Sequence, residues 1–246
     1  MQESTGKIAF PFVDGVRKIT ACFLKVESDA WPFAERNTAP IDAHWAQAKQ
    51  RNPQYFNGIV HLVQDMRSEG DTLDASLVKT DFKSFLYWRE QGFPEAGVLD
   101  GFGSALIRSS DGHIVLGRQR KGNVNSGLAY PPSGFIDEQD IGADGAIDIA
   151  QSVVREVAEE TGIEAGLLVR DQGFYLTRSG AQLSIAVPFR VPMSTAELIS
   201  FVERKIAASH DSELAAIIPI ASRRDIKDLA MPRYGRLLLD ALLAEA

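Results

Sequence analysis

The sequence predicts a mixed α/β fold of the α+β kind, in which a smaller N-terminal α/β unit precedes a larger mixed unit. Strand-like apolar runs and segments with the residue spacing of helices occur in both parts of the chain. Residues 93–101 (FPEAGVLDG) resemble a linker, and the sequence after them is rich in turn signals. We therefore expect a boundary near residue 97, with one unit over residues 1–97 and another over residues 98–246.

The N-terminal unit is expected to begin with an apolar strand over residues 18–26. A helix is predicted over residues 40–52. The strand-like runs 58–68 and 72–82 lie on either side of the turn sequence SEGD, so we expect them to pair. A second helix is predicted over residues 83–93, where the apolar residues have helical spacing.

The larger unit is expected to begin with a hairpin over residues 101–122, because Asp111-Gly112 is a strong turn signal between two apolar strands. Residues 123–148 are expected to form a long loop rich in Gly, Pro, Asn and Asp. A helix follows it, with Asp148 as its expected cap and Gly162 as its expected end. The remaining predicted elements are strands at 173–179 and 182–191, a helix at 195–208, a strand at 215–221 and a C-terminal helix at 234–246.

Composition narrows the class of protein. The formal net charge is −7, so binding to a nucleic acid polymer is not expected. No apolar run reaches the length of a membrane span, and the N-terminal stretch has no apolar region of signal-peptide length. Cys22 is the single cysteine, so no intrachain disulfide can form. We therefore expect a cytoplasmic protein that does not bind membranes.

The segment Arg155–Ile163, REVAEETGI, concentrates charge on one helix. At about 100° per residue, Glu156, Glu159 and Glu160 share an arc of roughly 100°. The expected core face consists of Ala150, Val154, Val157 and Thr161. Such like charges destabilise a helix. A hard divalent cation reverses this effect, since Mg²⁺ binds carboxylate oxygens. The alternative interpretation is a solvated acidic surface.

These residues resemble the Nudix box, the signature Gx5Ex7REUxEExGU in which U is aliphatic. Its second half matches at every specified position from Arg155 to Ile163. The segments GRQRKG, LAYPPSGFID and DSELAAIIPIA are also similar to family segments, so the resemblance covers about residues 100–246. It implies an α/β/α sandwich with a mixed sheet. It also implies a hydrolase that uses Mg²⁺, or Mn²⁺, to cleave the pyrophosphate bond of a nucleoside diphosphate linked to another group.

The first half of the box departs from the family pattern. The pattern has 13 residues between its first glycine and the arginine, whereas 20 residues separate Gly134 from Arg155. The position of the first family glutamate holds Ile147, next to Asp148, and Ser133-Gly134 replaces a glycine pair. A lengthened box of this kind is similar to a subgroup that includes a UDP-glucose pyrophosphatase with its own N-terminal extension. A nucleotide sugar is therefore the favoured substrate.

The resemblance also implies roles for particular residues. Glu156 and Glu160 are the expected metal ligands, and Glu159 is expected to join a second cation or to polarise the attacking water. Arg155 lies four residues before Glu159, so it is expected to pair with that residue and to orient a glutamate. The catalytic base is expected to be either Glu159 or an acidic residue of the downstream loop, where Glu213 is favoured over Asp211. Candidate phosphate and substrate ligands are Arg118, Arg120, Lys121 and Gly134.

Two other functions stay open at this point. One is an ADP-ribose or CoA-type pyrophosphatase, which would use the same cation chemistry. The other is a non-catalytic nucleotide-binding module of the same fold, although a binder would not need all three glutamates of the helix. The N-terminal unit is a candidate for substrate recognition or for dimerisation, and a homodimer is compatible with the sequence.

Overall fold

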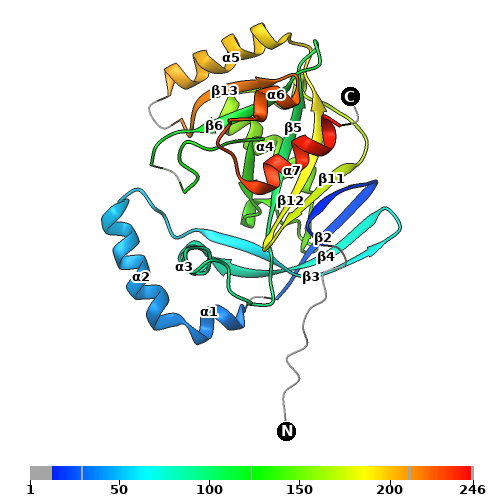
Figure 1. The fold of residues 1–246 in the computed structure, drawn as a ribbon. Coiled ribbons are helices and arrows are strands. Elements are labelled where there is room, and N and C mark those ends of the chain that lie inside the picture. Colours follow the sequence, from blue (N-terminus) through cyan, green and yellow to red (C-terminus); the bar gives the residue numbers. More distant parts are fainter. Residues whose placement is uncertain (1–12, 29, 123, 210–211, 245–246) are drawn as a thin grey trace.

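The computed structural model describes residues 13–28, 30–122, 124–209 and 212–244. Within these residues the chain forms two β-sheets with helices packed around them (Figure 1). This is the mixed α/β architecture that the sequence predicts.

The larger sheet contains nine strands in the described part of the chain, and its main path runs β1-β11-β12-β5-β6-β13. Strands β10, β7 and β8 pair with β12, β6 and β5 respectively. Pairing of β12 with β5 is parallel and the other pairs are antiparallel, so the sheet is mixed. The strands are β1 (Gly15–Ile19), β5 (Asp100–Arg108), β6 (Ile114–Gln119), β7 (Ala129–Tyr130), β8 (Ser133–Phe135), β10 (Val169–Arg170), β11 (Phe174–Ser179), β12 (Gln182–Arg190) and β13 (Leu214–Ile220).

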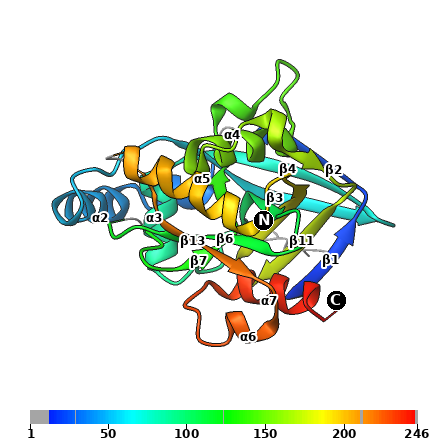
Figure 2. The same ribbon diagram turned by 90° about the horizontal axis from the view of Figure 1, so that it is seen from above.

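Helices cover both faces of this sheet, as an α/β/α sandwich requires (Figure 2). On one face, α4 (Ile149–Thr161) and α5 (Thr195–Ala208) share a core with Ala105 and Ile107 of β5. On the other face, α6 (Arg223–Ile226) and α7 (Arg233–Leu242) pack against Leu106. Because successive residues of a strand point to opposite faces, β5 contributes to both cores.

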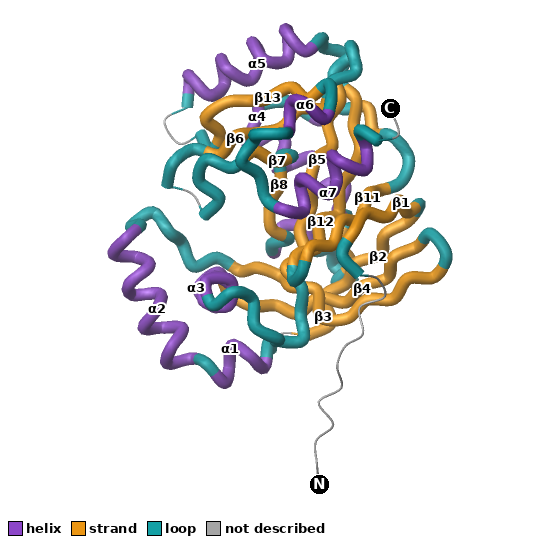
Figure 3. The backbone as a smooth tube through the Cα atoms, viewed as in Figure 1, coloured by secondary structure: helices purple, strands orange, loops and turns teal. Residues whose placement is uncertain are grey.

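The second sheet has the order β3-β4-β2-β9. The predicted pair of strands is confirmed, since β3 and β4 form an antiparallel hairpin. The helices of this part flank the sheet (Figure 3). The elements are β2 (Ala21–Ser28), β3 (Ile59–Glu69), β4 (Thr72–Asp81), β9 (Ala146–Ile147), α1 (Pro32–Arg36), α2 (Thr38–Arg51) and α3 (Phe82–Glu90).

The two parts of the chain exchange strands. The N-terminal strand β1 pairs with β11 of the larger sheet, and β9, from the long loop before α4, pairs with β2 of the smaller sheet. A single hydrophobic core contains Leu24, Val63 and Leu73 of the N-terminal part together with Val153 and Ile185. Residues on either side of position 97 therefore pack together over a shared core.

Among the described helices, none is both long enough and apolar enough to cross a membrane.

Candidate active site

Helix α4 carries the acidic segment, and its two ends are fixed by local hydrogen bonds. The Asp148 side chain accepts hydrogen bonds from the backbone N–H groups of Ala150 and Gln151, at 3.0 and 3.2 Å, which satisfies two free donors of the first turn. Gly162 ends the helix with a φ of 76°, a left-handed conformation that glycine adopts without steric cost. The predicted helix and both of its predicted ends are confirmed.

The buried face of α4 contains three of the four predicted core residues, Ala150, Val157 and Thr161, and extends beyond them. Glu160 is only 6% exposed, and Ile149, Val153 and Val157 are also buried. Val154, in contrast, is half-buried. The alternative interpretation of the three glutamates as a solvated acidic surface is therefore wrong for Glu160. The physical reason is that α4 packs against β8 as well as against β5 of the same sheet, so its buried arc is wider than one apolar stripe.

Strand β8 crosses directly over the carboxylates of α4, and Gly134 makes the close approach possible. A Cβ atom at position 134 would lie 2.0 Å from Cδ and 2.3 Å from Oε2 of Glu156. A side chain here would therefore displace the Glu156 carboxylate. This explains why a glycine stands at this position in the segment PPSGF.

Glu160 is held under β8 with one carboxylate oxygen unpaired. It accepts hydrogen bonds from the Gln119 side chain and from the Ser133 backbone N–H. Its Oε2 atom is buried and has no hydrogen-bond partner among the described residues. Burial, with the nearby negative charges of Glu213 and Glu156, raises the pKa of Glu160 well above its usual value. A buried carboxylate oxygen without a partner is costly unless something else binds it.

Arg155 connects the helix to the preceding loop. Its guanidinium lies 2.9 Å from Glu156 and 3.4 Å from Glu159. It also lies 3.2 Å from Asp140, the last residue of the short 3₁₀ helix η1 (Glu138–Asp140), and 3.4 Å from Asp137, which caps the start of η1. The predicted pairing with Glu159 is confirmed, but Arg155 has three further acidic partners. Burial raises the pKa of Glu156 to about 7, against the opposing effect of Arg155.

The seven extra residues of the box have a structural role. They allow residues 138–147 to form η1 and strand β9 before α4 starts. Ile147, at the position where the family has a glutamate, is buried and pairs with Leu24 of β2. The loop therefore supplies Asp137 and Asp140 to Arg155 instead. Sequence reasoning missed both residues, because they lie before α4 in a loop whose position relative to Arg155 is set by tertiary packing.

The carboxylates open into a cleft of about 760 Å³ between the two parts of the chain. Its acidic lining consists of Asp137, Glu156, Glu159, Glu160 and Glu213. Among the described residues that line the cleft, Arg155 is the one lysine or arginine, and its guanidinium is already paired. The opposite wall comes from the N-terminal part and is neutral; it is formed by Asn52, Gln54, Tyr55, Phe56, Gly58, Ile59, Val60 and Phe82.

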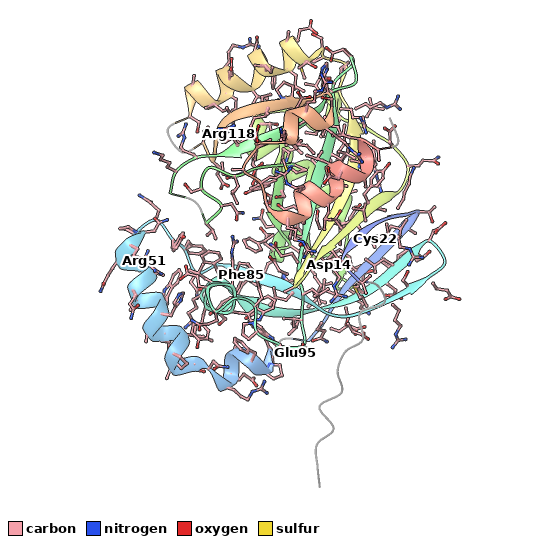
Figure 4. All side chains as sticks on the ribbon, viewed as in Figure 1. Asp14, Cys22, Arg51, Phe85, Glu95 and Arg118 are labelled. Carbon is pink, nitrogen blue, oxygen red and sulfur yellow. The ribbon has the colours of Figure 1, made fainter. Side chains whose placement is uncertain are left out.

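The other predicted site residues lie in different places. Gly134 and Glu213 line the cleft, and Glu213 stands just before β13, at an exposed position. Arg118, labelled in Figure 4, is exposed on β6. Neither it nor Arg120 or Lys121 is among the lining residues, so phosphate binding by these three stays a prediction. Asp211 lies outside the described residues.

The neutral wall was also missed by sequence reasoning. Residues 52–58 (NPQYFNG) follow α2 and read only as a turn, because nothing in the sequence shows which surface they meet. In the structure the Asn52 side chain donates a hydrogen bond of 2.7 Å to the carbonyl of Gly122, beyond β6. The Arg89 side chain donates one of 2.6 Å to Asn125 in the same loop. These contacts hold the N-terminal wall at the mouth of the acidic site.

A divalent cation suits the donors present, although no complete cage is formed in advance. In the described part of the chain, no three His, Cys, Asp or Glu side chains are arranged so that they could hold a metal ion alone. Mg²⁺ in phosphate sites is commonly bound through one or two carboxylates, with water and substrate phosphates completing its shell. The unpaired Oε2 of Glu160 beside Glu156 meets this requirement.

Comparison with known proteins identifies the class of protein. The family model described as the NUDIX domain matches residues 100–209. This part of the chain therefore belongs to the Nudix family. No curated protein sequence gives a significant match.

Several solved structures are similar to part of this chain at low sequence identity. A Nudix hydrolase from M. smegmatis, RenU, is 15% identical, with a TM-score of 0.40, and the match covers 58% of this chain and 83% of that one. The MutT protein from Methanosarcina mazei Go1 is 21% identical, with a TM-score of 0.42 and coverage of 60% and 94%. The NUDIX domain of Shewanella oneidensis NrtR, solved with ADP ribose, is 16% identical, with a TM-score of 0.39 and coverage of 63% and 91%.

Proposed function

We propose that this Nudix hydrolase uses Mg²⁺, or Mn²⁺, to cleave the pyrophosphate bond of a nucleoside diphosphate linked to another group. A nucleotide sugar is the favoured substrate, on the resemblance of the lengthened box to the subgroup with an N-terminal extension. We also propose that the protein works in the cytoplasm. A chain with one cysteine fits a reducing compartment of this kind.

The charge of the cleft is the observation that carries this proposal. Five carboxylates and one arginine line it within the described residues, and the arginine is paired to four acidic side chains. Such a cleft repels a diphosphate. It becomes attractive when divalent cations stand between carboxylates and phosphate oxygens, which is the role of metal ions in many phosphoryl-transfer sites. Without a bound cation, burial of Glu160 with an unpaired carboxylate oxygen would only cost folding free energy.

Each residue then has a proposed role. Glu156 and Glu160 hold the cation, and Glu159 is placed to hold a second one. When bound, the cation supplies positive charge to the phosphate oxygens and lowers the pKa of a coordinated water. Arg155 positions the Glu156 carboxylate at 2.9 Å and is not free to bind substrate. Gly134 lets the β8 backbone come close to that carboxylate, so that substrate can lie along the strand.

We propose Glu213 as the group that accepts the proton of the attacking water. Glu159 lies 3.4 Å from Arg155 and is therefore partly neutralised, whereas the described ion pairs include none made by Glu213. Glu213 lines the same cleft and lies near enough to Glu160 to raise the pKa of that carboxylate. A base must lie within reach of the water and be unprotonated.

A substrate panel tests the proposal. Purified protein is incubated with UDP-, ADP-, GDP- and CDP-linked sugars, ADP-ribose and CoA, with Mg²⁺ or with a chelator, and the products are separated by chromatography. We expect a nucleoside monophosphate as product, formed only with the cation. Faster hydrolysis of ADP-ribose or CoA than of the nucleotide sugars would identify the protein as an ADP-ribose or CoA-type pyrophosphatase. Nucleotide binding without hydrolysis of any member would indicate a non-catalytic module and contradict the proposal.

A further inference from the structure

The neutral wall of the cleft displays an aromatic ring that the fold itself does not use. Four large apolar side chains among the described residues are more than half exposed, and one of them, Phe56, lines the cleft. Phe56 is 81% exposed. An isolated exposed apolar residue needs no explanation by itself, but this one faces a cleft whose opposite side carries the candidate catalytic carboxylates.

The loop that carries Phe56 is held in place from both sides. Tyr55, the preceding residue, stacks on Trp45 with 6.3 Å between ring centroids and meets the edge of Phe82 at 5.6 Å. The Lys49 ammonium donates hydrogen bonds to the carbonyls of Pro53 and Tyr55, at 2.6 and 2.8 Å. The exposure of Phe56 is therefore built into a fixed loop, because its neighbours are anchored to α2 and α3.

The wall has the chemistry of a site for a flat, uncharged ring. Its described lining residues between positions 52 and 82 are aromatic, aliphatic, amide or glycine residues, and none is charged. The cleft volume of about 760 Å³ leaves room beyond the diphosphate group for the remainder of the substrate along this wall. Aromatic side chains stack on any nucleobase, because every base has a π-face.

We infer that Phe56 is the stacking platform for the planar heteroaromatic ring of the substrate, which is the nucleobase if the proposed function holds. The N-terminal part of the chain then binds the base, while α4 and β8 bind the diphosphate. Substrate bridges the two walls, and Phe56 contributes to affinity and not to the chemical step.

Binding of hydrolysis products tests this inference without any turnover. AMP, UMP, CMP, GMP and ribose 5-phosphate are titrated calorimetrically into the full chain in Mg²⁺. Wild type is expected to prefer at least one nucleotide to ribose 5-phosphate. Phe56→Ala should weaken binding of that nucleotide by about 5- to 150-fold, the range for losing one stacked base, and leave binding of ribose 5-phosphate unchanged. Phe56→Trp should retain binding, since the stacking surface is kept.

Phe23→Ala is the matched control, because Phe23 is also a surface phenylalanine, 61% exposed on β2, and does not line the cleft. Its nucleotide affinity should equal that of wild type. The inference is overturned if Phe56→Ala binds nucleotides as wild type does, if both variants lose affinity equally, or if wild type does not distinguish nucleotides from ribose 5-phosphate. Sedimentation gives a further test. If wild type is a dimer and the Phe56→Ala variant is a monomer, the ring contacts a second copy of the chain, and the inference is also overturned.

The experiment separates this inference from the proposed function. If the substrate panel shows no hydrolysis while Phe56 still discriminates nucleotides from ribose 5-phosphate, the proposed function fails and the stacking role holds. If hydrolysis is found and Phe56→Ala leaves both KM and nucleotide affinity unchanged, the proposed function holds and the stacking role fails.

Discussion

At the scale of single residues, Gly134 shows how a missing side chain sets the position of a functional one. The Cβ of an alanine would fall 2.0 Å from Cδ of Glu156. The atoms in the way belong to the end of a flexible side chain, so Glu156 can swing aside at small cost in folding stability. The candidate metal ligand then leaves its place, and a displacement of about 1 Å can cost about 10²-fold in rate.

We therefore predict that Gly134→Ala lowers kcat by about 10²-fold and changes the free energy of unfolding by less than about 1 kcal/mol, below the usual range for overpacking. Steady-state kinetics and urea titration measure the two quantities. Gly166→Ala is the control, because a Cβ there meets no atom within 4 Å. Full activity of Gly134→Ala would show that the position of Glu156 does not matter for turnover.

Glu213 gives a second prediction at this scale. If it accepts the proton of the attacking water, Glu213→Gln should lower kcat by about 10²–10⁴-fold, the range for a general base. The melting temperature should stay close to that of wild type, because the side chain is at an exposed position before β13. Glu203→Gln, an exposed change on α5, is the control. Normal kcat for Glu213→Gln with loss in Glu159→Gln would move the base to the helix.

At the scale of elements, α4 depends on its cap. Asp148 binds two backbone N–H groups at the start of the helix. Asp148→Ala should destabilise the protein by about 1 kcal/mol and lower the melting temperature by about 2–4 °C for a chain of this size. Asp148→Asn should restore most of the loss, since an amide oxygen also caps. An unchanged melting temperature in the alanine variant would mean that tertiary packing alone fixes the first turn of α4.

The elements also show what a sequence can and cannot predict here. Helix α4, with its cap and its Gly162 end, could be predicted because local spacing and turn chemistry determine them. The same holds for the β3–β4 hairpin. Burial of Glu160 could not, since it depends on β8 crossing the helix. The partners Asp137 and Asp140 of Arg155, and the Tyr55–Phe56 wall, come from loops whose place is set by long-range packing.

At the scale of the whole molecule, the exchanged strands bear on how the chain unfolds. Strand β1 completes the larger sheet and β9 the smaller one, and one core spans both parts. We predict a single cooperative transition in urea. The three tryptophans, Trp31, Trp45 and Trp88, all lie before residue 97, so their fluorescence reports on the N-terminal part, whereas far-UV circular dichroism reports on the whole chain.

The two signals should give the same midpoint, which is a standard test of two-state unfolding. A fluorescence midpoint well separated from the dichroism midpoint would instead show that residues 1–97 unfold as an independent domain. This outcome also bears on the cleft, because its neutral wall and its acidic wall come from different parts of the chain. Cooperative unfolding would mean that the shared core fixes the two walls of the cleft relative to each other.

The central claim is that the carboxylates of α4 form a divalent-cation site. Its most direct test is the melting temperature of wild type and of Glu160→Gln as Mg²⁺ is raised in the presence of a product nucleotide. Ligands that bind only the native state stabilise it by mass action. We predict that Mg²⁺ raises the melting temperature of wild type in a saturable way and leaves Glu160→Gln unchanged. If Mg²⁺ has no effect on wild type, or stabilises both proteins equally, Glu160 is not a cation ligand and the account is contradicted.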